Sequence, residues 1–295
     1  MPSTTPTTDQ MAAPYRGMDK AQIDAGYNNS AAVADSAIRV ENWTRRSEAV
    51  RAQPTARLDL RYGPKENNRI DFFPTTLGNS PAPLFVFVHG GYWFRNSKEV
   101  FAHVSEGPCA NGINVATVGY TLAPEASLSE ITQEVSDAIS FLAASADELG
   151  FDPNAIIVGG WSAGGQLATI SADHPNVAAI LSISGIFDLT PIRQSYIDDA
   201  LSLTFEEIET LSPLFNLPNK NLPLRLYVGG GELPELKRQS SAYTAAAVEH
   251  GLSAALDVLG RHNHFTIIDE LSDKEGLITL GLVRLVRDIT AARAA

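Results

Sequence analysis

The sequence predicts an α/β protein in which a mostly parallel, eight-stranded sheet is flanked by helices. From about residue 57 onward, short apolar segments of strand length alternate with longer amphipathic segments. This alternation is typical of parallel strands joined by crossover helices. The 295 residues are 44% hydrophobic and 19% charged, a composition that supports one large buried core. We therefore expect a single domain over residues 19–295.

The expected elements follow one another regularly along the chain. The predicted strands are residues 57–62, 69–73, 84–88, 115–120, 155–159, 178–184, 224–228 and 254–259. Apolar residues at helical spacing predict a helix over 128–149, and a second helix is expected over 234–250. Each of these helices is followed by a glycine, which commonly ends a helix.

Three segments depart from this alternation. Residues 1–18 are rich in Ser, Thr and Pro, which predicts a disordered leader. Residues 19–53 have helical character toward their end and are expected to wrap the domain. Residues 189–221 combine short amphipathic pieces with prolines, which predicts a small helical lid inserted after the sixth strand.

Charge and cysteine content narrow the classes of partner. The net charge of −12 and pI near 4.9 disfavour nucleic acid. The lone Cys109 forms no intrachain disulfide, and no apolar run is long enough to cross a membrane. We expect a cytoplasmic protein that acts on a small molecule and does not bind membranes. The oligomeric state, including a homo-oligomer, stays open.

The strongest chemical signal is the segment Gly-Trp-Ser-Ala-Gly at 160–164, a G-x-S-x-G motif. An apolar strand precedes it and a helix follows, as a nucleophile elbow requires. The sharp turn strains the serine backbone and leaves no space for neighbouring side chains, which explains the glycines. The pattern favours Ser162 as a catalytic nucleophile over a simple Gly-rich turn.

The second motif, His-Gly-Gly-Tyr-Trp at 89–93, directly follows the third predicted strand. A tetrahedral oxyanion needs preorganised donors, which come from this loop and from the amide after the nucleophile. We therefore assign the N–H groups of Gly90, Gly91 and Ala163 to an oxyanion hole. His89 is expected to brace the loop rather than act as a base. The alternative is a tight Gly-Gly turn beside an incidental histidine.

A general base is expected after the last strand, where His262 and His264 lie two residues apart. We favour His264, because it opens an apolar helical stretch and would lie above the sheet near Ser162. An H-x-H pair also binds metals, but no carboxylate-rich motif completes such a site, so no metal or other cofactor is expected.

The acid that orients the base usually follows the seventh strand. Glu232 stands at that position and is ranked first. Asp188, after the sixth strand, is ranked second, with helix capping as its alternative role. Glu235 is ranked third.

Four aromatic residues surround the expected site in sequence. Tyr92, Trp93 and Trp161 are predicted to bind substrate, with Phe94 beside them. An aromatic leaving group would stack on such rings. The alternative is that they pack the loops at the strand ends.

Together these segments resemble the kynurenine formamidase (arylformamidase) family of α/β-hydrolases, close to the hormone-sensitive-lipase-like esterases. Besides the two glycine motifs, the resemblance rests on SGIFDLTPIRQSYIDDAL at 184–201, LSPLF at 211–215, GGELPELKRQS at 230–240, HNHF at 262–265 and the stretch AGYNNSAAVADS. This chain has Glu232 where the family usually places an aspartate.

The resemblance implies an α/β-hydrolase fold, a Ser162–Glu232–His264 triad and acyl transfer without a cofactor. N-formyl-kynurenine is the expected substrate, with small-acyl aryl amides or esters as the broader class. A general carboxylesterase, or an amidase or imidase of the same family, is the alternative. A catalytically inactive binding module is disfavoured, because every expected position carries a competent residue type, and a scaffold is disfavoured because the sequence has no repeat or coiled coil.

Overall fold

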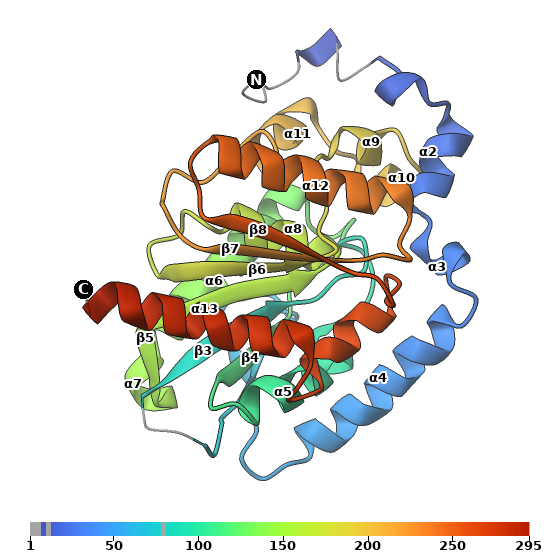
Figure 1. Ribbon diagram of the computed structural model, residues 1–295. Coiled ribbons are helices and arrows are strands. Elements are labelled where there is room, and N and C mark those ends of the chain that lie inside the picture. The colour runs from blue at the N-terminus through green and yellow to red at the C-terminus, as the bar shows by residue number, and fades with distance from the viewer. Residues whose placement is uncertain (1–6, 10–12, 78–80, 295) are drawn as a thin grey trace.

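The computed structural model describes residues 7–9, 13–77 and 81–294, and it contains all eight predicted strands (Figure 1). The strands are β1 (Arg57–Arg61), β2 (Arg69–Phe73), β3 (Ala82–Val88), β4 (Asn114–Val118), β5 (Phe151–Trp161), β6 (Val177–Ile183), β7 (Leu224–Gly229) and β8 (Ala254–Leu259). They form one sheet in the order β1-β2-β4-β3-β5-β6-β7-β8. Strand β2 is antiparallel to both neighbours, and every pairing from β4 to β8 is parallel. The predicted fold class is therefore confirmed.

Helices connect the strands and cover both faces of the sheet (Figure 1). The helices before β5 are η1 (Tyr15–Gly17), α2 (Lys20–Tyr27), α3 (Asn29–Ala32), α4 (Ser36–Arg51), η2 (Lys98–Ser105), α5 (Glu106–Cys109), α6 (Leu128–Ala144) and α7 (Ala146–Leu149). Those after β5 are α8 (Ala163–Ile170), α9 (Thr190–Arg193), α10 (Asp198–Leu201), α11 (Phe205–Leu211), α12 (Pro234–Glu249), η3 (Thr266–Leu271) and α13 (Leu277–Ala294). The helix predicted over 128–149 is divided at Ser145, and α12 matches the second predicted helix to within one residue. None of the helices in the described ranges has both the length and the apolar character that crossing a membrane requires.

The core lies on both faces of the sheet because side chains alternate along each strand. In β3, Leu84, Val86 and Val88 pack in one apolar cluster with residues of α6, α8 and α12. Phe85 and Phe87 lie in the other cluster, with residues of α4, η2 and α13. Burial on both faces explains why β3 is a continuous apolar run rather than an alternating one.

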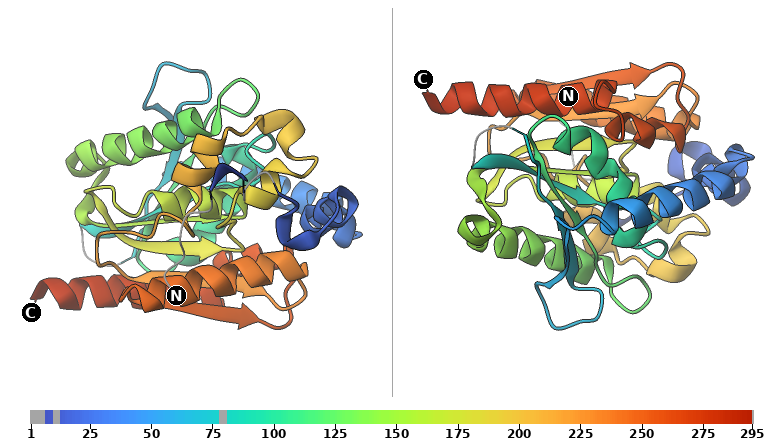
Figure 2. Two further views of the ribbon diagram at one scale, coloured as in Figure 1. Left: turned by 90° about the horizontal axis from the view of Figure 1, so that it is seen from above. Right: turned by 90° about the horizontal axis from the view of Figure 1, so that it is seen from below.

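The N-terminal helices α2 and α3 lie at the end of the sheet toward which its parallel strands point (Figure 2). Ligands bind at this end in open α/β sheets. Of the predicted leader, residues 1–6 and 10–12 lie outside the described residues. Tyr15, also predicted to be disordered, instead donates hydrogen bonds to Asp188 (Oη to Oδ2, 2.9 Å) and Gln194 (N to Oε1, 3.0 Å). The N-terminal segment is therefore held against the segment that follows β6.

Candidate active site

Ser162 lies at the sharp turn between β5 and α8. Its backbone has φ 58° and ψ −120°, a strained conformation for a residue with a side chain. The Ser162 N–H donates to the Ile183 carbonyl at 2.8 Å, which ties the turn to the neighbouring strand β6. The buried hydroxyl therefore has a fixed position at the carboxyl end of the sheet.

The glycines around Ser162 are required by close backbone packing. A Cβ atom on Gly160 would lie 2.3 Å from the Gly164 carbonyl oxygen. A Cβ atom on Gly164 would lie 2.0 Å from the Val88 carbonyl oxygen. Both contacts involve main chain, which cannot move aside as a flexible side chain does. Helix α8 reaches this close approach to β3 only with glycine at these positions.

We expect Gly164→Ala to destabilise the protein, because the added methyl group forces α8 away from β3. Overpacking of this kind costs about 3 kcal/mol or more of unfolding free energy. The matched control is Gly260→Ala, because a Cβ atom there meets no atom within 4 Å. Thermal unfolding of both variants checks the prediction, and an unfolding temperature for Gly164→Ala equal to that of the control would contradict it.

The loop after β3 packs directly on the nucleophile turn. A Cβ atom on Gly90 would lie 2.5 Å from the Trp161 carbonyl oxygen and 3.0 Å from Ser162 Cβ. Gly91 has φ 125°, a backbone conformation that side chains rarely permit. Within the described part of the chain, the N–H groups of Gly90, Gly91 and Ala163 donate to no other protein group. These three donors are thus free to bind an oxyanion.

His264 and Glu232 form a buried pair beside this loop. His264 Nδ1 lies 2.7 Å from Glu232 Oε2. The other carboxylate oxygen, Oε1, accepts from the Gly229 N–H at 2.6 Å and from the Ser184 hydroxyl at 2.5 Å. Because the carboxylate accepts, the proton of a neutral His264 lies on Nδ1, and Nε2 is left with a free electron pair. This is the tautomer that a general base needs.

The other residues considered as the acid or the base form different contacts. Asp188 accepts hydrogen bonds from the Tyr15 hydroxyl and from the Thr190 N–H, both at 2.9 Å. Since Thr190 is the first residue of α9, the second bond resembles the helix-capping role that was the alternative for Asp188. Glu235 forms an ion pair with Arg238 at 2.9 Å. His262 contacts the carboxylate of Glu270 at 2.9 Å. The structure therefore brings His264 against Glu232 and against neither alternative acid.

His89 lies behind the loop rather than beside Ser162. Its ring stacks on Tyr120 with ring centroids 4.2 Å apart, and its Nδ1 lies 3.0 Å from the Gly90 carbonyl oxygen. Burial lowers the pKa of His89 to about 4, so the ring is neutral at pH 7. A neutral ring whose Nδ1–H donates to Gly90 fits the bracing role that the sequence predicted.

Ser162 and His264 line one cavity of about 310 Å³, at the lower end of the range for small-molecule sites. The lining residues are Asn29, Ser30, Ser36, Ala37, Val40, Gly91, Tyr92, Arg95, Asn96, Trp161, Ser162, His264 and Phe265. One wall of the cavity therefore comes from α3 and α4. Residues 189–221 were expected to form a lid. None of these residues, all of which the structure describes, lines this cavity.

The aromatic residues divide between the cavity and the core. Tyr92 and Trp161, which were predicted to bind substrate, line the cavity, and the Trp161 Nε1–H donates to the His264 carbonyl at 2.8 Å. Trp93 differs from the prediction. It is fully buried, its Nε1–H donates to Gln166 Oε1 at 3.0 Å, and it does not line the cavity. Its backbone has a positive φ of 62°.

The sequence reasoning missed the contribution of the N-terminal segment to the site. The Tyr92 hydroxyl donates to the Tyr27 carbonyl at 2.5 Å and accepts from the Asn29 N–H and Nδ2. Trp43 of α4 packs edge-on against Trp161, with ring centroids 5.5 Å apart. The stretch AGYNNS was noticed for its resemblance, but no local pattern shows that it lies beside residues more than sixty positions away.

Several known proteins are similar to this chain in sequence or in structure. The BD-FAE family model matches residues 70–204. Kynurenine formamidase from Danio rerio is 25% identical over 291 residues, which cover 92% of this chain and 98% of the relative. A solved structure described as a candidate thioesterase from Silicibacter sp. TM1040 has a TM-score of 0.79 and 29% identity, covering 89% of this chain and 99% of that one. Esterase B from Lactobacillus rhamnosis has a TM-score of 0.69 at 16% identity, covering 90% and 97%, and supports the fold alone. The chain is an α/β-hydrolase that resembles the kynurenine formamidases over most of its length.

Proposed function

We propose that this kynurenine formamidase-like α/β-hydrolase cleaves small-acyl aryl amides or esters through an acyl-enzyme formed on Ser162. The observation that carries the proposal is the buried His264–Glu232 contact of 2.7 Å on the cavity that Ser162 lines. Nucleophile, base, orienting acid and oxyanion donors are the complete set that acyl transfer requires.

The proposed reaction has two halves. His264 Nε2 removes the Ser162 proton while the oxygen attacks the substrate carbonyl, and the N–H groups of Gly90, Gly91 and Ala163 stabilise the oxyanion. Glu232 stabilises the imidazolium that forms. The leaving amine or alcohol takes this proton and departs. Water, activated by His264, then cleaves the acyl-enzyme and releases the acid.

The substrate class follows from the cavity and from the relatives. A volume of about 310 Å³ holds a molecule with one aromatic ring and leaves little room for a long acyl chain. Trp161 precedes the attacking serine and lines the same cavity, so we expect its ring to restrict the space for the acyl group. Since the relative from Danio rerio is named a kynurenine formamidase, we propose an N-formyl aryl amide such as N-formyl-kynurenine as the preferred substrate. Ser162 would then be formylated, and formate would be the second product.

The test compares kcat/KM for N-formyl-kynurenine and a simple aryl formamide with the values for p-nitrophenyl acetate and butyrate. One methylene that a pocket does not accommodate costs about 1–3 kcal/mol, and butyrate has two more methylenes than acetate, so we expect acetate to be preferred over butyrate by at least about tenfold. We also expect release of formate from both formamides. A preference for butyrate without any formate would instead indicate a general carboxylesterase, the second candidate. The cytoplasmic location stays a prediction, and the oligomeric state stays open.

A further inference from the structure

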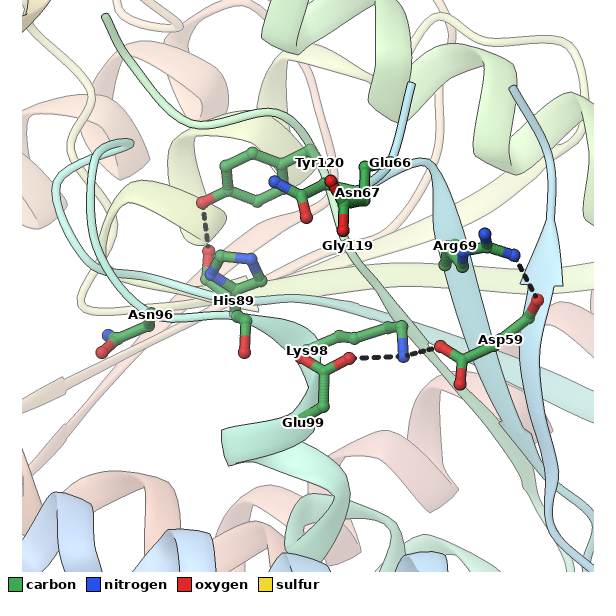
Figure 3. Close-up of a pocket in the computed structure, with 11 residues that line it drawn as sticks. Asp59, Glu66, Asn67, Arg69, His89, Asn96, Lys98, Glu99, Gly119 and Tyr120 are labelled. Atoms are coloured by element: carbon green, nitrogen blue, oxygen red, sulfur yellow. Dashed lines mark hydrogen bonds and ion pairs between the residues drawn. The ribbon is translucent and has the colours of Figure 1, made fainter. Parts of the chain in front are cut away.

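A second cavity, of about 200 Å³, borders the oxyanion loop (Figure 3). His89 and Asn96 both line it, and Asn96 also lines the cavity that contains Ser162. Asn96 is therefore the residue of this loop that contacts both cavities.

The side chain of Asn96 holds a carbonyl group of the oxyanion loop. Asn96 Nδ2 donates to the Gly90 carbonyl oxygen at 3.1 Å, and His89 Nδ1 donates to the same oxygen at 3.0 Å. The backbone of Asn96 has φ 69°, a left-handed conformation that asparagine tolerates better than most residues. The Arg95 N–H donates to the Gly91 carbonyl at 2.9 Å, which closes the turn and brings Asn96 back over the loop.

Holding the Gly90 carbonyl also fixes the direction of an oxyanion donor. The Gly90–Gly91 peptide is trans, so its C=O and N–H groups point in opposite directions. With the carbonyl bound by His89 and Asn96, the Gly91 N–H points to the other side, and Gly91 lines the cavity with Ser162. This peptide needs such restraint because glycine on both sides permits rotation of the peptide plane.

We propose that Asn96 is a positioning residue that keeps the Gly90–Gly91 peptide in the orientation competent for oxyanion binding. The inference rests on the proposed function, because it assigns the Gly91 N–H to the oxyanion hole. Asn96 does not touch the reacting atoms. It acts through the peptide that it holds, and its loss allows the Gly90 carbonyl to rotate toward the developing negative charge.

Two variants separate this role from general support of the loop. Asn96→Gly removes the donor and permits the positive φ. Asn96→Asp keeps the shape but replaces the donor by a carboxylate, which repels the Gly90 carbonyl and attracts the Gly91 N–H. The matched control is Asn67→Asp, which makes the same charge change in the same cavity wall without a hydrogen bond to the Gly90 carbonyl.

We expect kcat to fall about tenfold for Asn96→Gly and up to about 100-fold for Asn96→Asp, with KM nearly unchanged, because the donor acts on the transition state. Binding of an aryl trifluoromethyl ketone, which forms a tetrahedral oxyanion with the serine, should weaken in parallel with kcat. Binding of the aryl amine product should not change, because it has no oxyanion. If Asn96→Asp does not fold, Asn96→Gly carries the test.

Three results would overturn the inference: wild-type kcat in the folded Asn96 variants, a loss expressed only in KM, or an equal loss in Asn67→Asp. Failure of the proposed function has a different signature. In that case the wild-type protein would hydrolyse none of the amides and esters, or the Ser162→Ala variant would keep full activity.

Discussion

Ser162→Ala is expected to abolish turnover of every substrate, with a fall in kcat on the order of 10⁴ to 10⁶. The variant keeps the cavity and the oxyanion donors but removes the atom that forms the acyl-enzyme. Alanine has the same Cβ atom as serine and therefore adds no strain to the backbone at φ 58°, so the variant is not expected to unfold. Initial rates together with thermal unfolding check both parts of the expectation.

Covalent labelling gives a second measurement of the same assignment. A serine-directed phosphonofluoridate should modify Ser162 alone, because its hydroxyl shares a cavity with His264. Ser184→Ala is the matched control, since Ser184 is also buried near the site but donates to Glu232. This control should still be labelled at Ser162. Labelling of another serine, with activity intact in Ser162→Ala, would show that the nucleophile is wrongly assigned.

Glu232→Gln is expected to lower kcat by about 10⁴, the loss that a neutral amide causes at the orienting position of a serine protease triad. The structure gives the reason. Oε1 of Glu232 accepts two donors, from Gly229 and Ser184, so the carbonyl oxygen of a glutamine would stay there. Its NH₂ group would then face His264 Nδ1 and favour the tautomer protonated on Nε2, which cannot take the Ser162 proton.

Asp188→Asn is the control for this prediction, because Asp188 is the alternative acid. Its carboxylate accepts from Tyr15 and Thr190 and has no contact with His264. We expect kcat to stay within about tenfold of the wild type, with any effect expressed in the docking of the N-terminal segment. Parallel measurement of kcat in the two variants decides between the acids. A larger loss in Asp188→Asn than in Glu232→Gln would place the orienting acid after β6.

Local patterns in the sequence determined the fold class, the strands and the residue types at the site. The eight strands are evident because each combines an apolar run with nearby turn residues, and burial on both faces of a parallel sheet requires such runs. Ser162 and the glycines proposed for the oxyanion hole stand out because the turns that contain them need backbone conformations or close packing that few residue types permit. These constraints act within a few positions along the chain, so a short segment contains their whole signal.

Only the tertiary structure decided which side chains meet. Glu232, Glu235 and Asp188 were all plausible acids in sequence, and the contact with His264 depends on how the ends of β6, β7 and β8 lie together in space. The same holds for Trp93, which is fully buried and contacts Gln166 of α8, a partner 73 positions away in the chain. The N-terminal wall of the cavity, including Asn29, forms through contacts with Tyr92, 63 positions away. Contacts between distant segments leave no periodic pattern in either segment, so the local sequence does not reveal them.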